Sequence, residues 1–181
     1  MNQALVFYHF GSVDDLLVAA CTTRTAERVA HYSAQFDAVG SLRELLEVGR
    51  GMHAQERSLG NLSVLAQLLA GAQNDERLAA PVAAALRLWI DQIERVLDRL
   101  LAGSPVADVA DVPGLARTVA AAFVGIELYE GVDPAGAGRA LAALEQLATL
   151  VEVVDELGPV SRRALRAKIS RRDGTRKPSR A

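Results

Sequence analysis

The sequence predicts an all-α fold in the form of a helical bundle. Half of the 181 residues are apolar but only 4% are aromatic, and much of the apolar content is Ala, Leu and Val. Ala and Leu are strong helix formers, whereas strands are enriched in aromatic and β-branched residues. Apolar positions recur at helical spacing between Gly, Pro and Asn breaks, with no run of strict polar–apolar alternation. The length suits one domain, or one domain with a small appendage.

The expected helix boundaries follow from capping residues and breaks. Gly11 ends a short first helix, and Ser12 followed three residues later by Asp15 is typical of a capping box. Ser41, Asn74 or Asp75, and Pro113 mark further helix starts. The helices expected in chain order are 2–9, 13–36, 42–55, 62–70, 76–101, 113–130 and 139–157. We expect a loop over 106–112, a flexible connection over 131–138 and a short basic helix within 161–172.

Charge divides the chain into an acidic body and a basic tail. Residues 161–181 carry nine basic side chains and one acid, so the total of −2 leaves a net charge of −10 on residues 1–160. We expect the tail to be largely disordered, above all over 173–181. Three roles remain open for the tail: added affinity for nucleic-acid phosphates, attraction to an anionic membrane surface, or solubility alone.

The sequence gives no support for secretion or for a membrane span. Cys21 is the only cysteine, so no intrachain disulfide can form, and the start lacks the basic region of a secretory signal. The longest nearly apolar run, 115–128, is shorter than the roughly 18–20 residues that cross a bilayer. A cytoplasmic protein is expected by elimination.

Catalysis is not expected either. His9, His31 and His53 are spaced by 22 residues and lack the i, i+3 or i, i+4 pairing of a metal site on a helix. No Gly-rich phosphate loop appears. Glu127 and Glu130 fall on an apolar helix, but two carboxylates on one helix are weak support for acid–base chemistry. We therefore predict no metal and no cofactor.

The helices expected at 113–130 and 139–157 predict a homodimer. Both are apolar on more than one side, so each must be covered on more than one side. The bundle core can cover one face, and a second copy can cover the other in a four-helix interface. The predicted interface residues are Val119, Phe123, Ile126, Leu144, Leu147, Val151 and Val154. The alternative is that both helices are central and buried within one domain.

Residues 2–17 contain the most specific motif in the chain. A short helix closes in Phe7-Tyr8-His9-Phe10, turns at Gly11-Ser12, and is followed by two acids and two leucines over 14–17. This stretch resembles the end of the helix-turn-helix in transcriptional regulators of the tetracycline-repressor (TetR) type. Outside residues 2–17 the chain is similar to that family in architecture only, with several helices followed by two long hydrophobic ones.

The resemblance implies a ligand-responsive, DNA-binding transcriptional regulator that acts as a homodimeric repressor. Residues 1–11 would be a remnant of the recognition helix, and 12–160 the ligand-binding and dimerisation domain. Asn and Gln can pair with adenine edges in the major groove, and Tyr and His can hydrogen-bond phosphates. The predicted DNA contacts are Asn2, Gln3, Leu5, Phe7, Tyr8 and His9. The alternative is that these aromatic residues form only a packed cluster.

Two departures from the family pattern weaken the expected DNA contacts. Val13 stands where the family usually has a phosphate-contacting Lys, and no Lys or Arg precedes Arg24. The roughly 30–40 residues of the first two helices are also absent, although a helix under about 12 residues is marginal alone. We therefore expect the given start to lie inside a longer reading frame. The alternative function is a stand-alone helical ligand-binding or dimerisation module that does not bind DNA.

The resemblance also implies a pocket for a small-molecule effector among the helices over 13–112. Occupancy of that pocket would move the recognition helices apart. The candidates are large or polar side chains on otherwise apolar helices, because such pockets combine apolar walls with a few orienting polar groups. They are Phe36, Met52, His53, Gln67, Trp89, Phe123 and Tyr129. The alternative for each is a core residue without ligand contact.

Overall fold

The computed structural model describes residues 12–104, 106–107 and 110–155, together with positions 161, 163, 164 and 167. Within these residues the regular elements are all α-helices, which confirms the predicted all-α fold class. The helices are α2 (Val13–Ala38), α3 (Leu42–Ser58), α4 (Asn61–Ala72), α5 (Glu76–Leu101), α6 (Val112–Glu130) and α7 (Pro134–Asp155).

Polar caps fix three of the helix starts at the predicted positions. The Ser12 hydroxyl accepts a hydrogen bond from the backbone N–H of Asp15 at 3.0 Å, and Ser41 caps α3 in the same way. Asp75 accepts from the N–H of Arg77 at 2.9 Å at the start of α5. Each cap satisfies an N–H that has no partner inside its helix, which confirms the predicted starts of α2, α3 and α5.

The predicted flexible connection over 131–138 is wrong, because α7 begins at Pro134 rather than at residue 139. The Asp133 carboxylate accepts from the N–H of Gly136 at 2.9 Å, which is the geometry of an N-terminal cap. Proline at the first helical position loses no hydrogen bond, since its N–H would have no partner inside the helix. The Asp-Pro pair therefore starts the helix and leaves a turn of only three residues after α6.

Some sequence predictions lie outside the described residues. These are the short helix at 2–9, the end of the last predicted helix at residue 157 and most of the basic segment 161–181. The four described positions of that segment, 161, 163, 164 and 167, are helical and exposed.

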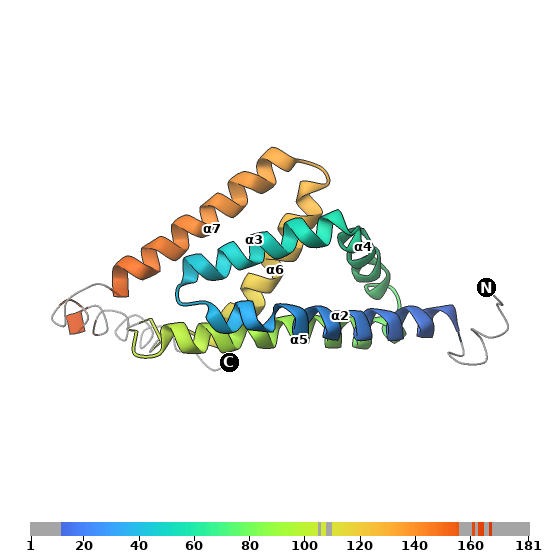
Figure 1. The fold of residues 1–181 in the computed structure, drawn as a ribbon, viewed down its shortest axis with the longest axis horizontal. Helices are drawn as coiled ribbons and strands as arrows, with labels where there is room; N and C mark the ends of the chain where they lie inside the picture. The colour runs from blue at the N-terminus through green and yellow to red at the C-terminus, as the bar shows by residue number, and fades with distance from the viewer. Residues whose placement is uncertain are drawn as a thin grey trace, which may run out of the picture.

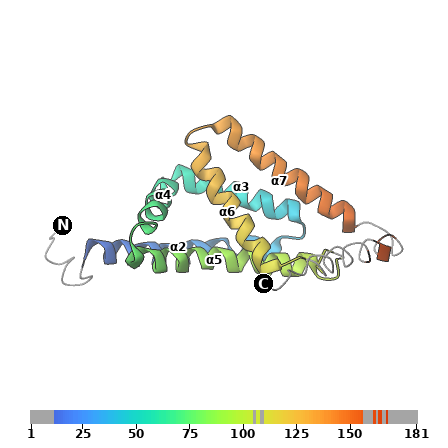
Figure 2. The same cartoon turned by 180° about the vertical axis from the view of Figure 1, so that it is seen from behind.

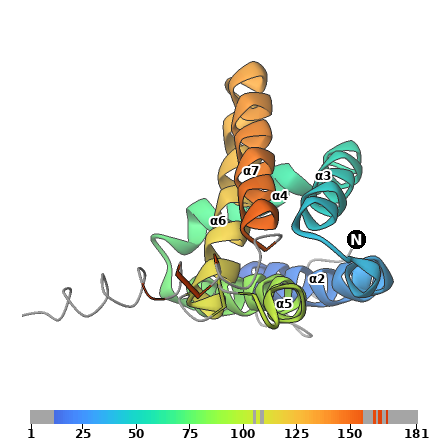
Figure 3. The same cartoon turned by 90° about the vertical axis from the view of Figure 1, so that its left-hand side faces the viewer.

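The helices form two levels. α2 and α5 lie side by side along the length of the molecule, with α3 above α2 (Figure 1). α4 leads the chain back down to α5. α6 rises obliquely from the end of α5, as the view from behind shows (Figure 2), and α7 starts near the top of α6 and slopes away from it, in contact with α6 and α3. Seen from one end, α6 and α7 stand as an upright pair over α5, while α3 stands over α2 (Figure 3).

The core fixes the C-terminal half of α2 to α5. Tyr32 and Phe36 of α2 are almost fully buried, as is Val96 of α5. The guanidinium of Arg99 on α5 donates to the backbone carbonyls of Phe36 and Val39, each at 2.9 Å. These carbonyls lie at the C-terminal end of α2, where a positive charge is favourable. This end of α2 is therefore held by both packing and charge.

α6 is the one described helix that is long and apolar enough to cross a membrane by length and composition, with a mean hydropathy of 1.2. A single such helix is weak support for a membrane span, since core helices of soluble proteins meet the same criteria. α6 contacts both α5 and α7, and its C-terminal turn carries two glutamates that pair with side chains of α3.

Candidate functional site

A cavity of about 470 Å³ lies between the two levels of helices. α2, α3, α4, α5 and α6 all contribute to its wall, whereas the lining contains no residue of α7. Pockets for small molecules typically measure about 300–1,000 Å³ and have mostly apolar walls. The larger apolar lining residues are Phe36, Leu45, Met52, Val64, Leu65, Leu68, Val82, Leu86, Trp89, Ile93, Val119, Phe123 and Val124.

Arg28 and Glu56 form one polar part of the wall. Arg28 Nε donates to Glu56 Oε1 at 2.6 Å, and a second guanidinium nitrogen contacts the same oxygen. The amide of Asn61 donates to Glu56 Oε2 at 2.5 Å, so both carboxylate oxygens are occupied. Both charged side chains are about 15% exposed (15% and 14%). A hydrogen-bonded pair at this depth ties α2 to α3 and to the first residue of α4.

Tyr32 extends this network into the core. Its hydroxyl accepts from Arg28 at 2.8 Å and donates to the side-chain oxygen of Gln55 at 2.7 Å. Burial raises the pKa of the Tyr32 hydroxyl, and the negative charge of Glu56 raises it further. The phenol therefore remains neutral and keeps the proton that it donates to α3.

His53 of α3 lies between two carboxylates of α6. Its Nδ1 is 3.4 Å from Glu127 Oε1, and its Nε2 is 2.5 Å from Glu130 Oε2. Arg57 pairs with the other oxygen of Glu130. An imidazole can donate through both nitrogens only when it is protonated. Within the described ranges, no group of three or more His, Cys, Asp or Glu side chains is arranged to hold a metal ion.

Glu127 is the least compensated carboxylate in the cavity wall. Its side chain is 16% exposed, and among the described residues its one hydrogen-bonding partner is His53. Burial raises the pKa of the Glu127 carboxyl. His53 opposes this shift, and the carboxylates of Glu56 and Glu130 add to it. The charge of Glu127 is therefore costly in the absence of a further positive partner.

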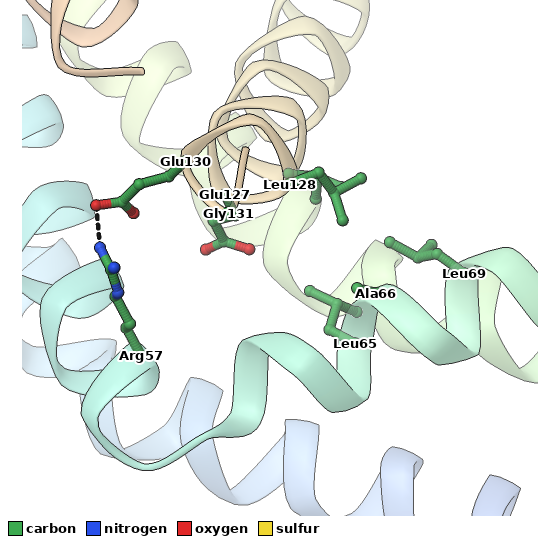
Figure 4. A pocket seen from close by; sticks show the side chains of 9 residues that line it. Arg57, Leu65, Ala66, Leu69, Glu127, Leu128, Glu130 and Gly131 are labelled. Carbon is green, nitrogen blue, oxygen red and sulfur yellow. Dashed lines mark hydrogen bonds and ion pairs between the residues drawn. The ribbon is translucent and has the colours of Figure 1, made fainter. Parts of the chain in front are cut away.

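A second, smaller cavity of about 220 Å³ adjoins this corner. Figure 4 shows the Arg57–Glu130 pair on one side of it and Leu65 and Leu69 of α4 on the other, with the Glu127 carboxylate between them. Glu127 and Leu65 line both cavities, so the two share part of a wall.

Five of the seven predicted ligand residues lie around the larger cavity: Phe36, Met52, His53, Trp89 and Phe123. Gln67 and Tyr129 do not. Gln67 is exposed on α4, and Tyr129 is 48% exposed and donates to the Asp133 carboxylate at 3.1 Å.

Sequence reasoning did not select Arg28, Glu56 or Glu127 as lining residues. The sequence does indicate that Arg28 faces the interior, because it lies four residues before Tyr32 and eight before Phe36. That spacing places it on the buried face of α2. The pairing of His53 with Glu127 joins residues 74 positions apart, which no local pattern reveals.

The structure divides the predicted dimer residues between two faces. Val119 and Phe123 line the cavity and therefore face the interior of the chain. Ile126, Leu144 and Val151 are partly buried, and Leu147 is 57% exposed. The side chain of Val154 lies outside the described residues. Further exposed apolar side chains on these two helices are Leu115, Leu128, Leu150 and Val153.

The residues predicted to contact DNA, Asn2, Gln3, Leu5, Phe7, Tyr8 and His9, lie outside the described part of the chain. α2 starts two residues after the end of the segment 1–11.

Comparisons with protein-family models, with curated proteins and with solved structures found no match for this chain.

Proposed function

We propose that this chain is the ligand-binding and dimerisation part of a ligand-responsive DNA-binding transcriptional regulator, which acts as a homodimeric repressor. One observation carries the proposal: α2 both lines the 470 Å³ cavity and begins directly after the segment that resembles a recognition helix. A ligand that displaces α2 therefore also displaces the residues attached to its N-terminus.

The anchoring of α2 suggests which part of it moves. Its C-terminal half is held to α5 through Tyr32, Phe36 and the contacts of Arg99. Its N-terminal half contributes Ala20, Arg24 and Thr25 to the cavity wall. A ligand that fits better when this half swings outward shifts the population toward that state, since a ligand favours the state that it binds more tightly.

Homodimerisation through α6 and α7 is the second part of the proposal. Leu147 and Leu150 of α7 are 57% and 61% exposed, and Leu128 of α6 is 48% exposed. A second copy that packs against these side chains buries them in a two-fold interface. Such a dimer presents two recognition helices to two half-sites about one helical turn apart.

Selection of duplexes from a random pool tests the DNA-binding part. The intact protein is expected to enrich a palindromic sequence, with an affinity that falls as salt rises. A variant that lacks residues 161–181 is the control for binding through the basic tail, and it should enrich the same sequence. A protein that dimerises but enriches no sequence would instead be a stand-alone module.

A further inference from the structure

The cavity wall contains two arginines and two glutamates, but Glu127 is not paired with either arginine. Glu56 has both oxygens occupied, by Arg28 and Asn61, so its charge is already compensated. Arg24 is exposed and forms its ion pair with Glu27 at 3.3 Å. Neither arginine therefore compensates Glu127.

The partners of Glu127 are weak or shared. His53 approaches it at 3.4 Å, while the other ring nitrogen of His53 lies 2.5 Å from Glu130. Arg57, the other cation at this corner, pairs with Glu130 and does not line the large cavity. The carboxylate of Glu127 thus faces the cavity with one long contact, and a positive group beside it would offset the cost of its burial.

The remaining wall is suited to an apolar ligand body. Trp89, Phe36 and Phe123 supply aromatic rings, and aliphatic side chains of α4 and α5 complete the lining. Aromatic faces attract organic cations, and they do so more strongly where water is excluded. A small hydrated ion gains nothing from such a wall, whereas a cation that carries a hydrocarbon body can use both features.

We propose that the cavity binds a monovalent organic cation with an apolar body, with the positive group beside Glu127 and the body against Trp89 and Phe123. The inference rests on the proposed function in one respect only, namely that the cavity is the effector site. An anion of the same size would meet Glu127 and Glu56, while Nε and one terminal nitrogen of Arg28 are already engaged by Glu56 and Tyr32. The volume of about 470 Å³ accommodates a ligand of ordinary small-molecule size.

A set of probes that differ in charge but share one hydrocarbon body tests the proposal. Adamantyltrimethylammonium, adamantanecarboxamide and adamantanecarboxylate carry a positive, no and a negative charge, and none of them fluoresces. Trp89 is the only tryptophan in the chain and lines the cavity, so its emission reports binding. We expect the cation to bind about tenfold more tightly than the amide, and the carboxylate to bind more weakly than either.

Two variants test whether the preference for the cation depends on Glu127, which lines the large cavity, or on the neighbouring Glu130. Glu127→Gln keeps the shape of the side chain and should reduce cation affinity about tenfold while leaving amide affinity within about twofold. Glu130→Gln is the matched control, because Glu130 also contacts His53 but does not line the large cavity. This control should keep the preference for the cation.

The outcomes distinguish this inference from the function on which it rests. Equal binding of all three probes, or tightest binding of the carboxylate, overturns the cation preference but leaves the cavity as a ligand site. Loss of cation preference in Glu130→Gln as well as in Glu127→Gln overturns the role given to Glu127. Absence of binding by every probe, checked by calorimetry on the intact protein, overturns both the cation preference and the effector site.

Discussion

The ring of Phe123 on α6 lies directly against Gly49 on α3. A Cβ atom at residue 49 would come within 2.4 Å of Phe123 Cζ and 2.8 Å of Cε1. Glycine in a helix interior is otherwise unfavourable, so the close approach of the ring gives a physical reason for it here. Phe123 also lines the large cavity, and Gly49 thus sets how far the ring can withdraw from that space.

Gly49→Ala should therefore reduce the volume of the cavity. The added methyl group forces the Phe123 ring toward the cavity, which should weaken binding of adamantyltrimethylammonium by about tenfold. Gly51→Ala on the same helix is the control, because a Cβ at residue 51 meets no atom within 4 Å. That control should gain up to about 1 kcal/mol of stability from helix propensity and keep its affinity. Equal affinities in the two variants would contradict the role of the Phe123 ring.

The Arg28–Glu56 pair should be strongly coupled. Arg28→Met leaves the Glu56 carboxylate buried without its cation, and we expect the free energy of unfolding to fall by about 3 kcal/mol. Arg28→Met combined with Glu56→Gln removes the uncompensated charge and should recover a substantial part of this loss. Urea denaturation of Arg28→Met, Glu56→Gln and the double variant measures the effect. A double variant as unstable as the sum of the two single variants would show that the two side chains are not coupled.

The stability of the fold should depend on pH through Glu127. Burial raises the pKa of this carboxyl in the folded chain above its ordinary value of 4.5. As pH rises, the unfolded chain therefore loses this proton before the folded chain does. Between the pKa of the unfolded chain and that of the folded chain, the contribution of Glu127 to the free energy of unfolding decreases with pH. Glu127→Gln removes the contribution. The stability of the variant relative to the original protein should thus increase from the ordinary pKa toward neutral pH.

Urea denaturation of Glu127→Gln and of the original protein at several pH values measures the difference between their free energies of unfolding. The contributions of the other titrating groups largely cancel in this difference. A relative stability that falls toward neutral pH would mean that the ionised form of Glu127 stabilises the fold.

Charge placed on the outer face of α7 should separate the proposed dimer. Leu150→Glu introduces a carboxylate at a side chain that is 61% exposed in one protomer, and a dimer interface would bury it at high cost. Sedimentation equilibrium should show a monomer for this variant and a dimer for the original protein. Leu59→Glu is the control, since Leu59 is similarly exposed, at 54%, but lies in the turn after α3. A dimer that withstands Leu150→Glu would place the interface elsewhere.

Local sequence signals predicted most of the helix boundaries. Ser12, Ser41 and Asp75 each place a polar side chain directly before a helix, and each forms the expected cap. The start of α7 was not predicted, because the glycines within 131–138 indicated a flexible connection. Asp133-Pro134 indicates a helix start, since an acid followed by proline is common there. The predicted ends fell short by two or three residues in α2, α3 and α4, where no proline interrupts the chain.

The site was predicted less completely, for a physical reason. Large side chains on apolar helices, such as Trp89 and Phe123, stand out from their neighbours in the sequence and do line the cavity. Glu127 and Glu130 also stand out, but their partner His53 lies on another helix, and only the packing of α3 against α6 brings them together. The sequence also did not predict which side chains of α7 are exposed, since an apolar helix can pack against the core of its own chain or against a second copy.

The proposed coupling between the cavity and DNA is tested most directly by fluorescence anisotropy of a selected duplex bound to the intact protein. Adamantyltrimethylammonium at saturating concentration should weaken binding of that duplex at least about fivefold, and Gly49→Ala should respond less than Gly51→Ala. A probe that binds the cavity and leaves the affinity for DNA unchanged would contradict the proposed regulation, as would a protein that binds selected and scrambled duplexes equally.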